Sequence, residues 1–223
     1  MGLGNDFRSE REKLKNANTK QKLQFFWDYY KWVVIVGLIV IAVVISFVYP
    51  AIESKDVVLS GICLNSYQSS FETSYDVLIQ DFLTAQGLDP DDCTMELTAG
   101  MIYDPDNQDA AEINYQSIQR IGAQITMGGL DVMIGNLGAM QAFADSGSFY
   151  ELSEVLPQEL MERYEPHLIP GVQGNWILID VSGCDQLMEN YPYLSEPLVL
   201  GIAVNAPNRE MIVELIAYLL QRT

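Results

Sequence analysis

Histidine, cysteine and basic residues are scarce in this chain of 223 residues. It has one histidine, three cysteines, and 12 lysines and arginines against 30 acidic residues. A lone histidine cannot build a zinc site, and three cysteines are too few for a disulfide scaffold. One bridge with a spare thiol, or three buried thiols, remain open for Cys63, Cys93 and Cys184. The formal net charge of −18 excludes nucleic acid as a natural partner.

Catalytic signatures are also missing. The chain has no G-x-S-x-G, no phosphate-binding glycine loop and no H-E-x-x-H. The acidic loop that begins at Asp104 departs from a calcium loop, because Asp109 stands where a glycine is needed and Tyr115 where a bidentate glutamate is needed. We therefore expect a protein that is not an enzyme and that uses no metal and no cofactor.

One long apolar run is present, from Trp32 to Ile52, and its 21 residues carry no charge. About 20 such residues in a helix span the hydrocarbon of a bilayer. Seven of the 12 basic and four of the 30 acidic residues precede the run, which leaves five basic and 26 acidic residues after it. Since positive flanks stay in the cytoplasm, the sequence predicts a cytoplasmic segment (1–31), a transmembrane helix (32–52) and an extracellular domain (53–223) of a single-pass cell-membrane protein.

A cleaved signal peptide is the alternative to a retained anchor. Signal peptides have a shorter apolar core followed by a cleavage site of small residues. The C-terminal end of this run, Tyr49-Pro50-Ala51, has no A-x-A pattern. Tryptophan and tyrosine are enriched at membrane surfaces, and they flank this run at positions 27, 29, 30, 32 and 49. We therefore favour the retained anchor.

Strands and helices alternate through residues 53–223, which predicts an α/β domain built on a parallel sheet with helices on both faces. Gly87 and the pair Gly128-Gly129 are expected to end helices. The predicted strands are Asp56 to Leu64, Thr94 to Met101, Leu130 to Gly135, Trp176 to Val181 and Leu198 to Val204. The predicted helices are Thr73 to Gly87, one after Asn107 with Ile113, Ile118, Ile121 and Ile125 on one face, one with Met140 and Phe143, and Arg209 to Gln221.

Several segments resemble type II periplasmic (extracellular solute-binding) proteins. They are Asn114-Tyr115-Gln116, Leu130 to Ile134 with its x-D-V-x core, Phe143 to Leu156, and Leu200 to Asn205 followed by Asn208-Arg209-Glu210. The W-x-Y-Y-K-W that enters the apolar run is similar to that of uncharacterised single-pass proteins of Gram-positive bacteria. The resemblance implies a domain that binds a small solute without catalysis. Because only Glu151 to Pro197 is left for a second lobe, we expect one lobe with a reduced second one.

Ligands of open parallel sheets bind beyond the carboxyl ends of the strands. The residues there mix polar groups with aromatic rings, which suit a small polar solute such as a sugar or a peptide. Each of these residues also has a possible structural role: Asn136 and Asp104 as helix caps, and Tyr67 and Tyr103 packing over the end of the sheet. For Trp176, Tyr191 and Tyr193, packing in the core is favoured over stacking on a ligand. The predicted ligand-binding residues are Asn65, Ser66, Tyr67, Tyr103, Asp104 and Asn136.

A second hypothesis for function is a structural or regulatory module that has lost the ligand cleft and contacts a membrane or envelope partner. A third, which we rank last, is an extracellular hydrolase, which carboxylates converging in a pocket would favour. A filled cleft with a contiguous apolar patch would favour that module, and an open cleft with aromatic walls would favour ligand binding.

Overall fold

The computed structural model describes residues 19–52, 55–66 and 75–221, and inside its first helix it describes the side chains of Trp27 and residues 31–46 only. The chain consists of two compact units, Met1–Ser54 and Lys55–Thr223. Of the predicted ligand-binding residues, only Tyr67 lies outside the described residues.

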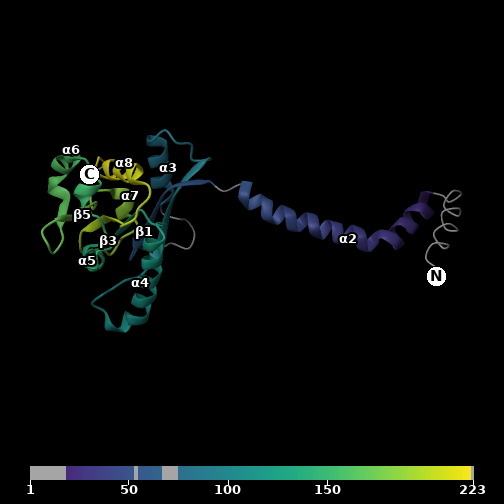
Figure 1. Ribbon diagram of the computed structural model, residues 1–223, viewed down its shortest axis with the longest axis horizontal. Coiled ribbons are helices and arrows are strands. Elements are labelled where there is room, and N and C mark those ends of the chain that lie inside the picture. The colour runs from purple at the N-terminus through teal and green to yellow at the C-terminus, as the bar shows by residue number, and fades with distance from the viewer. Residues whose placement is uncertain (1–18, 53–54, 67–74, 222–223) are drawn as a thin grey trace. The chain divides into compact units, whose positions relative to one another are not determined.

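The described part of the first unit is the long helix α2 (Thr19–Ile52), drawn in Figure 1. Within the part of the chain that the structure describes, no helix meets the length and hydropathy needed to cross a membrane. The predicted span, 32–52, is only partly covered, since the side chains of residues 47–52 are not described. Most of the predicted cytoplasmic segment, 1–18, also lies outside the described residues. The span and its orientation therefore stay predictions.

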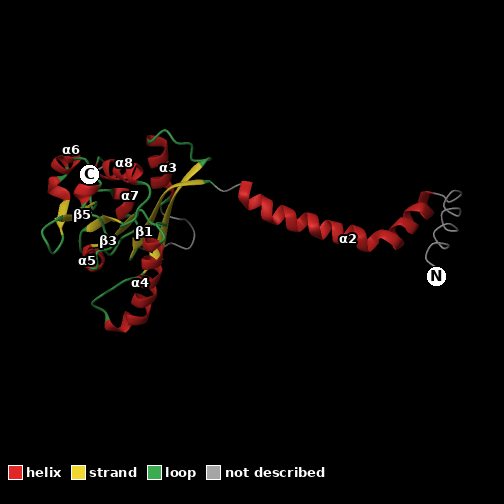
Figure 2. Ribbon diagram, viewed as in Figure 1, coloured by secondary structure: helices red, strands yellow, loops and turns green. Residues whose placement is uncertain are grey.

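The second unit is an α/β domain with a mixed sheet of six strands in the order β2-β1-β3-β6-β5-β4 (Figure 2). Its three-stranded part β2-β1-β3 is parallel, and the pairs β3–β6, β6–β5 and β5–β4 are antiparallel. The strands are β1 (Asp56–Leu64), β2 (Cys93–Met101), β3 (Val132–Asn136), β4 (Leu168–Pro170), β5 (Trp176–Asp180) and β6 (Leu198–Ile202).

Helices cover both faces of this sheet, so the core has two parts. Along β1, Leu59 and Cys63 pack on one face with residues of α3, α7 and α8, while Ile62 and Leu64 pack on the other face with α4 and α5. This alternation follows from the two-residue period of a strand, and it requires the continuous apolar run that the sequence has here. The helices are α3 (Asp76–Ala85), α4 (Ala111–Thr126), α5 (Leu137–Asp145), α6 (Gln158–Arg163), α7 (Asp185–Met188) and α8 (Arg209–Leu220), with 3₁₀ turns at Gln108–Ala110, Leu152–Glu154 and Glu165–His167.

The predicted α/β class is confirmed, but a parallel sheet is correct only for β1, β2 and β3. Residues 151–197 were expected to form a reduced second lobe, yet they contribute β4 and β5 to the same sheet, inside the same compact unit. Leu178 and Ile179 of β5 are fully buried on opposite faces, which explains why this segment joins the sheet instead of standing apart.

One predicted helix face is wrong in its first half. On α4, Ile121 and Ile125 are buried, whereas Ile113 and Ile118 are 49% and 41% exposed. The inward positions of the first half are held instead by Asn114 and Ser117, which hydrogen-bond to the loop after β2. None of the three cysteines, all in the described part of the chain, is in a disulfide.

Candidate functional site

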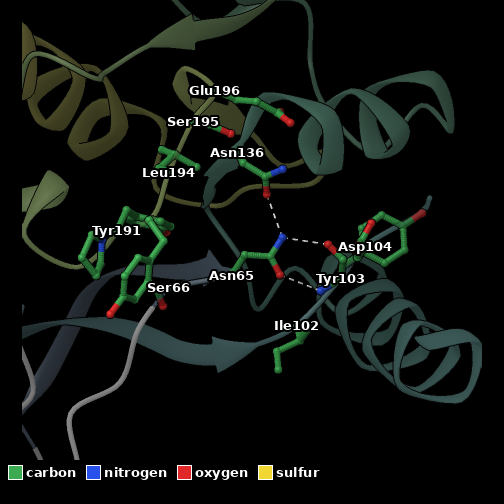
Figure 3. A pocket seen from close by; sticks show the side chains of 12 residues that line it. Asn65, Ser66, Ile102, Tyr103, Asp104, Asn136, Tyr191, Leu194, Ser195 and Glu196 are labelled. Atoms are coloured by element: carbon green, nitrogen blue, oxygen red, sulfur yellow. Dashed lines mark hydrogen bonds between the residues drawn. The ribbon is translucent and has the colours of Figure 1, made fainter. Parts of the chain in front are cut away.

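A cavity of about 500 Å³ opens where β1, β2 and β3 end, and Figure 3 shows the side chains around it. Segments from four parts of the chain form its wall: the end of β1, the loop after β2, the end of β3, and the segment that precedes β6. The lining residues are Asn65, Ser66, Ile102, Tyr103, Asp104, Asn136, Tyr191, Pro192, Tyr193, Leu194, Ser195 and Glu196.

Five of the six predicted ligand-binding residues line this single cavity: Asn65, Ser66, Tyr103, Asp104 and Asn136. They come together because the ends of adjacent parallel strands lie at one edge of the sheet.

Asn65 joins the ends of all three strands. Its side-chain amide donates to the carbonyl of Tyr103 and to Oδ1 of Asn136, both at 2.7 Å, and its Oδ1 accepts from the backbone N–H of Tyr103 at 2.8 Å. The three bonds appear as dashed lines in Figure 3. Asn65 has φ 56°, in the left-handed region that asparagine tolerates better than most residues. Its side chain is therefore fully used in holding the cavity together.

Asn136 stands at the N-cap position of α5, but its side chain makes no capping hydrogen bond. Its Oδ1 accepts from Asn65 instead, and its Nδ2 donates to no other described residue. The first turn of α5 is capped from elsewhere: the N–H of Gly138 donates to Oε2 of Glu196 at 2.9 Å, and the N–H of Leu137 donates to the carbonyl of Pro197 at 3.1 Å. Asn136 thus brings one unused amide group to the cavity wall.

Asp104 does not cap a helix either. Its Oδ1 accepts from the N–H of Asp106 at 3.2 Å, a turn within its own loop. Asn114 of α4 fixes this loop through the backbone of Asp104, since it accepts from its N–H at 3.0 Å and donates to its carbonyl at 2.6 Å. Ser117 donates to the carbonyl of Ile102 at 2.7 Å. The exposed carboxylate of Asp104 is therefore carried by a well-anchored loop.

A buried polar cluster lies beneath the cavity wall, formed by the Cys63 thiol and the hydroxyls of Tyr75 and Tyr191. Burial raises the pKa of Cys63 to about 11, and the neighbouring phenols lower it only in part. Burial, together with the Cys63 charge that would form, also raises the pKa of Tyr75 and of Tyr191. All three groups are accordingly protonated and neutral at pH 7, and the Cys63 thiol is not a nucleophile there.

The segment from Tyr191 to Glu196 was not predicted as part of the site. Tyr191 is buried and its hydroxyl donates to the carbonyl of Ile134 at 3.4 Å, as core packing implies, but Tyr193 is 90% exposed, so core packing is wrong for it. The segment reaches this edge because β6 runs antiparallel to β3 and its first residue, Leu198, pairs with Asn136. A parallel β6 would have put the same residues at the opposite edge of the sheet.

The wall of the cavity carries acidic and aromatic groups but no lysine, arginine or histidine. The two carboxylates, those of Asp104 and Glu196, belong to exposed residues, and no described residue forms an ion pair with either. Elsewhere among the described residues, no group of three or more histidine, cysteine or acidic side chains is placed to hold a metal ion. The cavity can bind through hydrogen bonds, aromatic faces and negative charge.

Comparisons with known proteins add nothing to this geometry: no protein-family model matches the chain, and neither the curated proteins nor the solved structures searched contain a match.

Proposed function

We propose that the chain is a single-pass protein of the cell membrane whose outer domain binds a small polar ligand without catalysis. The observation that carries the proposal is the cavity at the ends of β1, β2 and β3. Its volume of about 500 Å³ is in the range of small-molecule sites, and its wall combines apolar and aromatic surface with a few polar groups, as such sites do.

The anchor is supported by the sequence of residues 32–52 and by the charges on its two sides. Within α2, apolar side chains such as Val36, Leu38 and Val44 are about half exposed, and their spacing places them on different sides of the helix. A helix that is apolar all round needs an apolar surrounding, which a bilayer would supply. We therefore propose a cytoplasmic N-terminus and an extracellular domain from residue 53. The resemblance to solute-binding proteins remains a proposal that agrees with this arrangement.

The alternative is an envelope-interaction module that has lost ligand binding. It is favoured by exposed apolar side chains on and beside the first half of α4, namely Ile102, Ile113, Tyr115 and Ile118. Ile102 also lines the cavity, so a partner protein would cover part of the same surface. The two functions differ in what raises the stability of the domain: a small molecule in one case, a protein in the other.

Thermal unfolding of the full chain in detergent micelles, with pools of sugars, amines, amino acids, peptides and dicarboxylates, tests the proposal. A ligand at 100 times its Kd adds about 2.7 kcal/mol. For a domain of this size each kcal/mol raises the midpoint by about 2–4 °C. We expect at least one pool to raise the midpoint of the outer domain by about 5 °C or more.

Two tryptophan substitutions make this test specific for the cavity. Ser195→Trp puts a large side chain at the cavity wall and is expected to abolish the shift. Gln80→Trp does the same at a second cavity of about 390 Å³, lined by residues of α3 and of the turn before β2, and is expected to leave the shift unchanged. If no pool shifts the midpoint, or both variants respond like the wild type, ligand binding in this cavity is wrong and the envelope module takes its place.

A further inference from the structure

The first two backbone N–H groups of α5 are not available to an anionic group in the cavity. In α/β folds an anion is usually held by the N–H groups at the start of the helix that follows a strand. Here the first two N–H groups of α5, those of Leu137 and Gly138, are already bonded to the carbonyl of Pro197 and to the carboxylate of Glu196. The chain therefore supplies its own negative charge where an anionic ligand would bind.

Two carboxylates keep unused acceptor atoms at the wall. Glu196 uses Oε2 for Gly138, and no hydrogen bond of the described residues involves its Oε1. Asp104 uses Oδ1 for the turn at Asp106, and its Oδ2 is likewise unused. With no basic side chain in the wall to balance them, these carboxylates make a negative field that attracts a cation and repels an anion.

Aromatic and amide groups complete the wall. Tyr103 is held in place by its backbone bonds to Asn65 and by its ring, whose centroid lies 4.9 Å from that of Phe143. Tyr193 is largely exposed and leaves a second ring at the cavity. Tyrosine faces attract ammonium groups through the ring quadrupole. The Nδ2 of Asn136 is a donor for a hydroxyl or carbonyl oxygen elsewhere on the ligand.

We propose that the ligand of this cavity is a small organic amine, bound as a cation between the carboxylates of Asp104 and Glu196 and against the tyrosine rings. The proposal rests on the proposed function, since it names the chemical class that the same cavity accepts. The overall negative charge of the outer domain does not decide this point. The decisive features are the occupied start of α5 and the unbalanced carboxylates at the wall.

Matched compounds that differ only in charge are the direct test. The first set is putrescine, butanediol and succinate, which share a four-carbon chain. The second is glucosamine, glucose and glucuronate, which share a sugar ring. Their binding to the full chain in detergent micelles is measured by isothermal titration calorimetry and by the unfolding midpoint. We expect the amine of at least one set to bind at least tenfold more tightly than its neutral analogue, and the acids not to bind.

Charge-removing variants locate the effect. Asp104→Asn and Glu196→Gln keep the size of each side chain and an oxygen for its backbone hydrogen bond, and each is expected to weaken amine binding about tenfold. Asp76→Asn and Asp91→Asn remove an exposed carboxylate at the second cavity and serve as controls with the same change in net charge. They are expected to leave amine binding unchanged. Because the field at the wall is exposed to solvent, binding is expected to weaken between 10 and 150 mM salt.

The outcomes separate this inference from the proposed function. Amine binding that is lost in Asp104→Asn or Glu196→Gln, and kept in the controls, supports both. A neutral or acidic compound that binds at least as tightly as its amine, and that loses its binding in Ser195→Trp, would overturn the proposal that the ligand is an amine. The proposal that the cavity binds a ligand would still hold. Amine binding that is equal in all four carboxylate variants is non-specific and also overturns the inference. No binding by any compound of the sets or pools overturns both proposals.

Discussion

Asp131, at one edge of the sheet, uses its carboxylate in the opposite way to Asp104 and Glu196 at the other edge. At the start of β3, Asp131 is fully buried, and its carboxylate accepts from the N–H and hydroxyl of Ser60 and from the N–H and side-chain amide of Asn208. At the other edge, beyond the ends of β1, β2 and β3, the carboxylates of Asp104 and Glu196 each accept one backbone hydrogen bond and are exposed. Both oxygens of Asp131 are therefore used, whereas Asp104 and Glu196 each keep one unused oxygen.

This difference separates structure from binding. A buried carboxylate is tolerated only when its hydrogen bonds are satisfied inside the protein, and Asp131 meets that condition by tying β1 and β3 to the start of α8. An exposed carboxylate on the wall of a cavity contributes little to stability, so its unused oxygen is available to a ligand. Acidic character alone would not distinguish Asp131 from Asp104 and Glu196. Burial and hydrogen bonding do.

The largest expected effect is at the buried Asp131. Asp131→Ala leaves the N–H groups of Ser60 and Asn208 without their acceptor, so we expect the free energy of unfolding to fall by about 3 kcal/mol or more. Thermal unfolding should show a midpoint lowered by about 6 °C or more. A loss below about 1 kcal/mol would mean that water replaces these bonds, and the contrast between Asp131 and the carboxylates of the cavity wall would fail.

The buried polar cluster of Cys63, Tyr75 and Tyr191 should make the stability of the domain fall at alkaline pH. The pKa of Cys63 is raised from 9.0 to about 11 by burial, so the folded state keeps this proton longer than the unfolded state does. The stability is fully present below pH 9 and is lost as the pH rises from 9 to 11, by roughly 3 kcal/mol, since each pKa unit corresponds to about 1.4 kcal/mol. Tyr75 and Tyr191 act in the same direction.

Denaturant unfolding at several pH values between 8 and 11 measures this loss, with Cys63→Ala as the control. The variant removes the thiol, so its loss over the range from 9 to about 11 should be smaller than that of the wild type. An equal loss in both proteins would assign the effect to other groups.

Two asparagines with left-handed backbone conformation sharpen the comparison further. Asn65 and Asn205 have φ 56° and 67°, but only the side chain of Asn65 is hydrogen-bonded within the described residues. Asn205→Ala should therefore cost about 1 kcal/mol, the backbone penalty alone. Asn65→Ala should cost about 2–3 kcal/mol, because the bonds to Tyr103 and Asn136 are lost as well. Equal costs, measured by denaturant unfolding, would show that the Asn65 amide does not hold the strand ends together.

The smallest effect on stability is expected at the cavity wall. Asp104→Asn and Glu196→Gln should each change the free energy of unfolding by less than about 0.5 kcal/mol without ligand, as exposed substitutions usually do. The midpoint of the unliganded protein measures this. A loss of about 2 kcal/mol or more would assign these carboxylates to the fold, as for Asp131.

Much of the fold could be predicted from the sequence where apolar residues are continuous. The expected limits of β1, Asp56 to Leu64, agree with the structure because both faces of this strand are buried. The three-residue strand β4 and the four-residue helix α7 were missed, since elements so short show no periodicity. On α4, the exposed Ile113 and Ile118 misled the prediction, because a pattern of isoleucines does not tell where the sheet beneath the helix ends.

The candidate site could be predicted in part for a similar reason. Asn65, Tyr103 and Asn136 follow strands whose parallel order was predicted correctly, so their meeting at one edge followed from topology. The wall from Tyr191 to Glu196 depends on the antiparallel direction of β6, and the spacing of strands in the sequence does not determine that direction. The role of Asp131 was also missed, because its partners Ser60 and Asn208 lie 71 and 77 residues away in the chain.

Hydrogen–deuterium exchange of the full chain, with and without the amine that raises the unfolding midpoint most, tests the central claim most directly. We predict slower exchange at Gly138, at residues 102–104 and at residues 191–196, with no change at Ser60 and Asn208. Slower exchange at Ser60 and Asn208, with none around the cavity, would contradict the assignment of ligand binding to the ends of β1, β2 and β3.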